Sequence, residues 1–158
     1  SLTVVVEVVT QESIQEQYRL LQDIFVLLDD GDRNDLAEFG ITTSQFRVLM
    51  LLNTVQGIRL ATLADRLLLA RSTITRIVDQ LEQDRLTKRL DDPADRRAQH
   101  VVLTELGAQL RQQAQVAHLR SLERRLSTLA PGEMNTLNDL LRKLRHSLGQ
   151  DLSARTGR

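Results

Sequence analysis

The chain has 158 residues, of which 41% are hydrophobic and 27% charged, as in an ordinary soluble globular protein. Lysine plus arginine number 21, and so do aspartate plus glutamate, so any affinity for nucleic acid must come from local clustering. The absence of cysteine excludes disulfides, thiolate catalysis and cysteine-ligated metals, and no stretch approaches the roughly 20 apolar residues of a membrane span. We therefore expect a cytoplasmic protein.

The first forty residues contain one predicted helix. Residues 1–10 are β-branched and could form a strand, an arm or a tail; Glu7 interrupts them and no basic region precedes them, so they make a poor signal peptide. From Glu12 an apolar stripe at alternating four- and three-residue steps predicts an amphipathic helix. Its members are Ile14, Tyr18, Leu21, Phe25 and Leu28. The polar run DDGDRND, residues 29–35, predicts a break after it.

A second helix is predicted from the run ITTSQF to about Asn53. Thr42 is a candidate N-cap with Gln45 three residues later, as in a capping box, while Ile41 and Phe46 can form a hydrophobic staple. The following segment TVQGIR, residues 54–59, is predicted to be a loop.

The next two helices, LATLADRL and RSTITRIVDQLEQD, have the pattern of a helix-turn-helix. Ala64 supplies the small residue required where the helices cross, and Ile74, Ile77 and Leu81 can face inward from the second helix. The opposite face carries Arg71, Thr73, Arg76 and Gln80, which can hydrogen-bond to phosphates or base edges. The alternative is a helical hairpin with a merely solvated polar face, since the turn has Leu68 where many such motifs have glycine.

Two β-prone runs, LTKRL and AQHVVLT, follow and are joined by DDPADRR, which predicts a hairpin. A helix-turn-helix followed by a two-stranded wing is a winged helix, whose wing can reach the minor groove of DNA. Arginine at the wing tip would exploit the negative potential there. The alternative is an ordinary solvated loop tip.

The rest of the chain predicts two long amphipathic helices separated by LAPGE, with Pro131 suited to a first helical turn. Their apolar stripes run from Leu106 to Leu129 and from Met134 to Leu152. Together with the stripe of the first helix they present more apolar surface than a small winged helix covers, which favours a two-fold symmetric dimer.

The run STITRIVDQLEQDRLTKRLDDPADRRAQHVVLTELG resembles the core pattern of the MarR (multiple antibiotic resistance regulator) family. The matching features are a T-x-L-V-x-x-L-E-like helix, a D-x-x-D-R-R wing tip and an L-T-x-x-G sequel. One departure is Arg85, which stands where the family usually has glycine. Arginine can take the left-handed conformation of that glycine only at some cost, so the conformation at Arg85 and the angle of the wing stay open.

The resemblance implies a mainly α fold with a small β-hairpin wing, a winged helix-turn-helix plus dimerisation helices. The expected division is 1–40 for the arm and first dimerisation helix, 41–104 for the DNA-binding region and 105–158 for the remaining dimerisation helices. The expected function is a transcriptional regulator, a repressor that binds a pseudo-palindromic operator in double-stranded DNA as a homodimer.

The expected contacts follow from the same resemblance. The recognition-helix residues are Arg71, Ser72, Thr73, Thr75, Arg76 and Gln80. The wing residues are Lys88, Asp95, Arg96 and Arg97, with the Asp95 carboxylate bracing the guanidinium of Arg97. A small lipophilic or aromatic effector could bind near Tyr18, Phe25, Phe39, Phe46 and Arg47, although aromatic rings in such positions are more often ordinary core.

Other classes of protein fit the sequence less well. It has no glycine-rich phosphate loop, nucleophile elbow or HExxH motif, so we expect neither an enzyme nor a cofactor. His100, His118 and His146 share no ligand spacing with one another, so no metal site is predicted. A helical protein-binding adaptor without DNA function remains the alternative.

Overall fold

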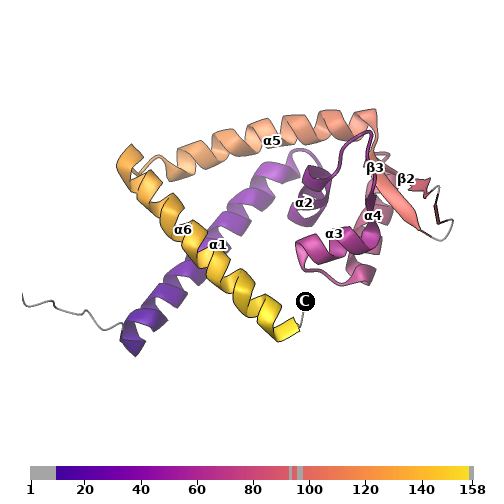
Figure 1. The fold of residues 1–158 in the computed structure, drawn as a ribbon. Coiled ribbons are helices and arrows are strands. Elements are labelled where there is room, and N and C mark those ends of the chain that lie inside the picture. Colours follow the sequence, from indigo (N-terminus) through magenta and orange to yellow (C-terminus); the bar gives the residue numbers. More distant parts are fainter. Residues whose placement is uncertain (1–9, 93, 96–97, 157–158) are drawn as a thin grey trace, which may run out of the picture. The chain divides into compact units, whose positions relative to one another are not determined.

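The computed structural model describes residues 10–92, 94–95 and 98–156. The elements in chain order are α1 (Gln11–Ala37), α2 (Thr43–Leu51), β1 (Ile58–Arg59), α3 (Leu60–Leu67), α4 (Arg71–Gln83), β2 (Thr87–Asp91), β3 (Gln99–Leu103), α5 (Glu105–Leu126) and α6 (Pro131–Thr156) (Figure 1). This is the predicted class, mainly helical with a small antiparallel sheet. The chain divides into two compact units, one up to His118 and one from Leu119. The expected three-part division stays a prediction.

Helix α1 is longer than predicted, because the expected break at 29–35 is wrong. Although Asp, Asn and Gly are weak helix formers, the Asp and Asn side chains here make contacts one turn apart. Arg33 pairs with Asp29 at 3.1 Å and with Asp30 at 3.7 Å. Leu36, only 1% exposed, then anchors the end of the helix in the core. At the other end Thr10 caps α1 by accepting from the backbone N–H of Ser13. Residues 1–9 lie outside the described part of the chain.

The predicted start of α2 is confirmed. The Thr42 hydroxyl accepts from the N–H of Gln45, whose side-chain oxygen accepts from the N–H of Thr42, and these two bonds form the capping box. Ile41 and Phe46, the expected staple pair, both join the core.

The sheet contains one strand that sequence reasoning took for a loop. Its order is β1-β3-β2, and all neighbours are antiparallel. The short strand β1 pairs Ile58 with Val101 and Arg59 with His100, so the expected loop at 54–59 is corrected at its end. Two residues are too few to show a period-two pattern. Gly57 precedes β1, and a Cβ there would lie 2.4 Å from the Cβ of His100, so the close approach of the two segments requires glycine.

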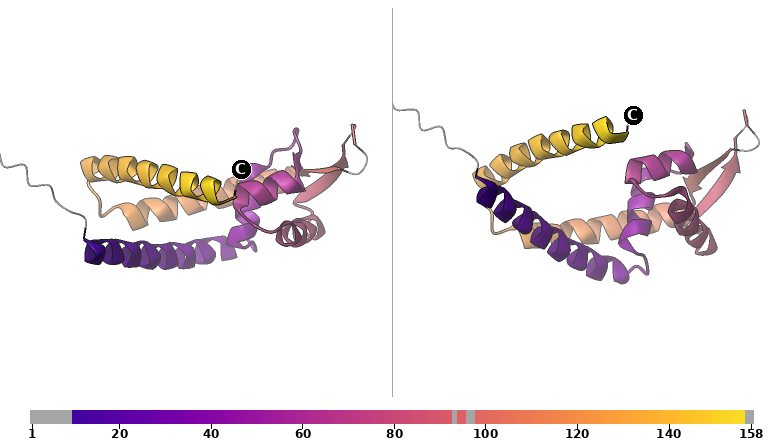
Figure 2. Two further views of the ribbon diagram at one scale, coloured as in Figure 1. Left: turned by 60° about the horizontal axis from the view of Figure 1, so that its bottom comes forward. Right: turned by 90° about the horizontal axis from the view of Figure 1, so that it is seen from below.

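The core of the first unit lies among α2, α3, α4 and the sheet. Its fully buried members include Leu49, Leu63, Val78 and Leu103, with Ala114 contributed by α5. Figure 2 shows α1 extending away from these elements, and Leu36 near its end is its buried residue.

The second unit comprises the end of α5 and α6. Pro131 begins α6 as predicted, and the Glu133 carboxylate accepts from the N–H of Ala130 just before it. Large apolar side chains on α6 are solvent-exposed, among them Leu140, Leu141, Leu148 and Leu152. Across residues 10–92, 94–95 and 98–156, no helix is both long and apolar enough to cross a membrane.

Candidate nucleic-acid interface

The predicted helix-turn-helix is formed by α3 and α4. Ala64 is 4% exposed, and Ile74, Ile77 and Leu81 are buried on the inner face of α4, as predicted. The turn adopts a left-handed conformation at Leu68 (φ 54°), where glycine would be strain-free. The N–H of Leu69 donates to the carbonyl of Ala64 at 3.0 Å, which closes the end of α3 despite the missing glycine.

The opposite face of α4 exposes most of the predicted recognition residues. Arg71, Ser72, Thr75, Arg76 and Gln80 are solvent-exposed, while Thr73 is half-buried. The Thr75 hydroxyl donates to the carbonyl of Arg71 at 2.9 Å, which leaves its oxygen able to accept.

The N-terminus of α4 carries positive potential towards solvent. The N-cap residue is Ala70, and in the described part of the chain no side chain caps the helix. The first-turn N–H groups therefore remain available to an anion, with the positive end of the helix dipole behind them. Residues 71–78 include Arg71 and Arg76 and no acid.

The acids at the other end of α4 are bound by Arg89 of β2. Its guanidinium contacts Asp79 at 2.6 Å and also pairs with Glu82, while its backbone N–H donates to Glu82 at 3.0 Å. Arg89 is only 20% exposed. This clamp holds the first strand of the wing against α4 and neutralises the two acids in the C-terminal half of that helix.

A second charged cluster lies at the base of the wing. The Asp92 carboxylate, 7% exposed, accepts from Arg59 at 2.7 Å and lies 3.3 Å from Nε2 of His100. It also accepts from the N–H of Ala94 at 2.8 Å. The backbone N–H of Ala94 and the guanidinium of Arg59 lower the pKa of Asp92 below its usual 3.8. An ionised Asp92 thus ties β1 and β3 to the turn that begins the wing tip.

The wing tip is described only in part. The N–H of Asp92 donates to the carbonyl of Ala98, and the N–H of Ala98 donates to that of Asp95, at 3.0 and 2.9 Å. Asp95 and Lys88 are exposed. Arg96 and Arg97 lie outside the described residues, so their predicted roles stay predictions. Figure 2 shows the β2–β3 hairpin extending away from α3 and α4.

The chain leaves α4 through a left-handed residue, Arg85, whose φ is 60°, which decides the conformation that the sequence left open. The N–H of Leu86 donates to the carbonyl of Leu81 at 2.8 Å and the N–H of Arg85 to that of Glu82 at 2.9 Å, the bonds of a Schellman motif. The wing therefore leaves α4 as it would with glycine at this position.

The L-T-x-x-G sequel locks that exit to α5. The Thr104 hydroxyl donates to the Arg85 carbonyl at 2.7 Å and accepts from the N–H of Gly107 at 3.0 Å, so it also caps α5. A Cβ on Gly107 would lie 1.9 Å from the carbonyl oxygen of Leu86. Contacts with backbone atoms therefore explain why the L-T-x-x-G positions hold Thr104 and Gly107.

The candidate effector residues have different surroundings. Phe46 is buried in the core and Phe39 packs against it. Tyr18 and Phe25 are 61% and 63% exposed on α1, and Arg47 is exposed on α2. The effector site stays a prediction.

Sequence reasoning missed the two charged clusters around Arg89 and Asp92. Arg89 lies seven residues after Glu82 across a helix–strand junction, and Arg59 lies 33 residues before Asp92. Seven residues would be two helical turns, but α4 ends at Gln83 between the two residues, and Arg59 and Asp92 belong to different segments, so periodicity reveals neither pair. The sequence showed only that acids and arginines occur on both the predicted helix and the predicted strands, without showing which of them pair.

Comparison with known proteins agrees with this architecture. A model of the MarR family matches residues 41–99, from α2 through the start of β3. A curated relative described as an uncharacterised HTH-type transcriptional regulator, YkoM of Bacillus subtilis, is 30% identical over 132 residues, which cover 84% of this chain and 86% of YkoM. The chain belongs to the MarR family.

Solved structures of MarR-family proteins share its fold. AbsC of Streptomyces coelicolor superposes with a TM-score of 0.78 at 25% identity, covering 92% of this chain and 99% of AbsC. A mutant MarR of E. coli, solved in complex with operator DNA, superposes with a TM-score of 0.75 at 28% identity. The match covers 83% of this chain and 94% of the E. coli chain. The predicted class is confirmed: the protein is a helix-turn-helix transcriptional regulator, and its relatives are regulators rather than enzymes.

Proposed function

We propose that this MarR-family protein binds operator DNA as a homodimer, with the N-terminal half of α4 in the major groove. The observation that carries this is the exposed face of α4, where Arg71 and Arg76 are open to solvent while the nearby acids Asp79 and Glu82 pair with Arg89. The solved complex of the E. coli MarR mutant with operator DNA supports the proposal. A protein with this activity acts in the cytoplasm, where bacterial DNA lies.

Within this interface, Arg76 and Thr73 help to read bases, while Arg71 and Ser72 contact backbone phosphates near the helix start. The reason is their position, since a recognition helix contacts base edges from its N-terminal turns. Thr75 and Gln80 are also exposed on α4.

The wing adds a minor-groove contact in this proposal. Because neighbouring residues on an extended arm point to opposite sides, the proposal assigns Arg96 and Arg97 to different contacts. In this assignment the carboxylate of Asp95, two residues before Arg97, would brace the guanidinium of Arg97, and Arg96 and Lys88 would contact phosphate. The preferred sequence beneath the wing is A·T-rich, because its minor groove is narrow.

Three single variants test the wing. Arg97→Ala should weaken binding strongly, Asp95→Ala should reproduce that loss in part, and Arg96→Ala should mainly reduce the salt dependence by about one phosphate contact. Titration on one duplex at two salt concentrations measures all three. A more damaging Arg96→Ala with a silent Asp95→Ala would reverse the assignment.

We also propose that DNA binding represses transcription and is relieved by a small aromatic or lipophilic effector. A relative named as a transcriptional repressor, IacR of Pseudomonas putida, is 26% identical over 113 residues, covering 72% of this chain and 68% of IacR. Arg47, an exposed cation that follows the buried Phe46, is suited to a carboxylate. Salicylate should release DNA from the wild type at lower concentrations than from Arg47→Ala; equal release from both would remove Arg47 from the site.

The adaptor alternative is tested with mixed genomic DNA. The proposed regulator should bind it at low salt and lose affinity steeply as salt rises, because bound arginines and lysines displace counterions from phosphates. Arg71→Ala should flatten the salt dependence, whereas Arg142→Ala, on exposed α6, should leave it unchanged. No binding at low salt would favour the adaptor.

A further inference from the structure

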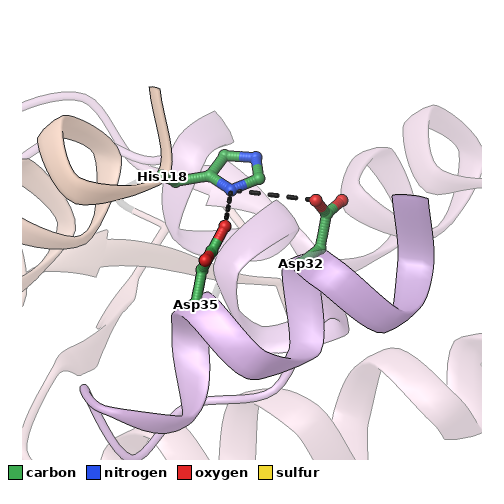
Figure 3. Close-up of side chains that lie close together, drawn as sticks. All are labelled: Asp32, Asp35 and His118. Carbon is green, nitrogen blue, oxygen red and sulfur yellow. Dashed lines mark hydrogen bonds and ion pairs between the residues drawn. The ribbon is translucent and has the colours of Figure 1, made fainter. Parts of the chain in front are cut away.

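Two helices bring three metal-ligating side chains together outside the DNA-binding surface. Asp32 and Asp35 come from the C-terminal part of α1. His118 comes from α5, 83 residues after Asp35 (Figure 3). Nδ1 of His118 lies 3.4 Å from a carboxylate oxygen of Asp35 and 3.8 Å from one of Asp32. Sequence reasoning missed this group because it compared the histidines only with one another.

The arrangement differs from acids scattered on a solvated surface. The side chains of His118, Asp35 and Asp32 are only 15%, 20% and 26% exposed. The imidazole stands edge-on to Phe46 of the core, with ring centroids 5.7 Å apart and planes at 74°. This contact orients the ring so that its Nδ1 faces the two carboxylates, as Figure 3 shows.

The carboxylates share a face of α1 because they are three residues apart. The cation between them in sequence, Arg33, pairs with Asp29 and Asp30 on the same helix. Two carboxylates and one neutral imidazole give a donor set of charge −2, which matches a divalent cation.

The spacing of the donor atoms suits a transition metal. Zinc bonds of about 2.0–2.1 Å to nitrogen and oxygen in a tetrahedron place donor atoms about 3.3–3.5 Å apart. The three donor atoms here all lie within 4.8 Å of one another, so modest side-chain rotations would bring them to that spacing. An imidazole ligand favours zinc or its transition-metal neighbours over magnesium or calcium.

We propose that Asp32, Asp35 and His118 form a binding site for a divalent transition-metal ion, with Zn²⁺ as its best probe and one coordination position left open. The bound ion would bridge α1 to α5 beside Phe46 of α2. Binding of the ion requires no DNA, so its test does not depend on the proposed operator binding.

The test uses the full chain after removal of metal with a chelator, and Zn²⁺ is titrated by calorimetry and by competition with a chromogenic chelator. The wild type should bind one Zn²⁺ per chain and gain thermal stability, because the ion binds the folded state. His118→Gln and Asp35→Asn should each weaken binding at least about 10–100-fold. The matched control His146→Gln, which changes an exposed histidine of α6, should bind as the wild type does.

Circular dichroism of the metal-free variants shows whether each is folded, and Co²⁺ absorption in the wild type reports a nitrogen and oxygen ligand field without relying on any variant. Equal Zn²⁺ affinity for wild type and His118→Gln would overturn the proposal. So would binding lost in His146→Gln, or a wild type without a Co²⁺ spectrum that saturates at one equivalent. In those cases the cluster is a histidine–aspartate ion pair only.

Discussion

Arg85 holds a backbone conformation that costs a non-glycine residue free energy, since its φ is 60°. Arg85→Gly removes this strain but gives the unfolded chain more conformational freedom, which opposes the gain. The net effect should be a fold more stable by a few tenths of a kcal/mol, up to about 1. Denaturant unfolding measures this. Arg76→Gly, in the exposed interior of α4, is the control and should destabilise by about 1 kcal/mol. A glycine at 85 that lowers stability would mean that the arginine side chain contributes more than its strain costs.

Gly107 is fixed by packing rather than by a turn. A Cβ there would lie 1.9 Å from the Leu86 carbonyl oxygen, a backbone atom that cannot rotate away. Gly107→Ala should destabilise by about 1–3 kcal/mol or more through this overpacking. Gly149→Ala, in α6 with nothing within 4 Å of the added carbon, should instead stabilise by about 0.5–1 kcal/mol. Thermal unfolding of the two alanine variants checks the contrast, and the same sign for both would contradict it.

At the scale of the element, the wing depends on an ionised Asp92. Because the N–H of Ala94 and Arg59 lower its pKa in the folded state below the usual 3.8, its contribution to stability is present above that value and is lost as pH falls through the folded pKa. Asp92→Asn should therefore be less stable than the wild type at pH 7, and the difference should shrink as pH falls below about 3.8. Urea unfolding at several pH values measures it, with Asp91→Asn, its exposed neighbour, as the control. A difference that is constant with pH would exclude this linkage.

Which elements the sequence could predict depended on how local their signals are. The start of α2 follows from its capping residues, and α3 and α4 follow from their apolar periodicity; both signals act within one or two turns. The break expected at 29–35 failed because side-chain pairs and the burial of Leu36 outweighed weak propensities. Strand β1 was missed because it exists only through its pairing with β3.

The candidate site divides in the same way. The exposed face of α4 could be predicted, because helical spacing places Ile74, Ile77 and Leu81 in one buried stripe and leaves the polar residues of the helix to solvent. The contacts of Arg89 with Asp79 and Glu82, and of Asp92 with Arg59, could not, because they join elements whose relative position only the fold determines.

At the scale of the whole molecule, the exposed apolar side chains of α1 predict a dimer. Phe25 and Leu27 are 63% and 70% exposed, more than an isolated chain in water favours. Phe25→Glu should shift the protein towards monomer in sedimentation and weaken its binding to DNA. Glu16→Gln, nine residues earlier on the opposite face of α1, should do neither. A wild type that sediments as a monomer at micromolar concentration would refute the dimer.

The central claim is that α4 reads DNA sequence, and Arg76 tests it most directly. A duplex selected by the protein from random sequences is compared with unselected duplexes, each titrated with wild type and Arg76→Ala at one salt concentration. We expect the variant to lose about 1–3 kcal/mol on the selected duplex and clearly less on random DNA, because a base contact is lost only where the base is present. Equal losses on both would assign Arg76 to a phosphate, and no loss on either would contradict the placement of α4 in the groove.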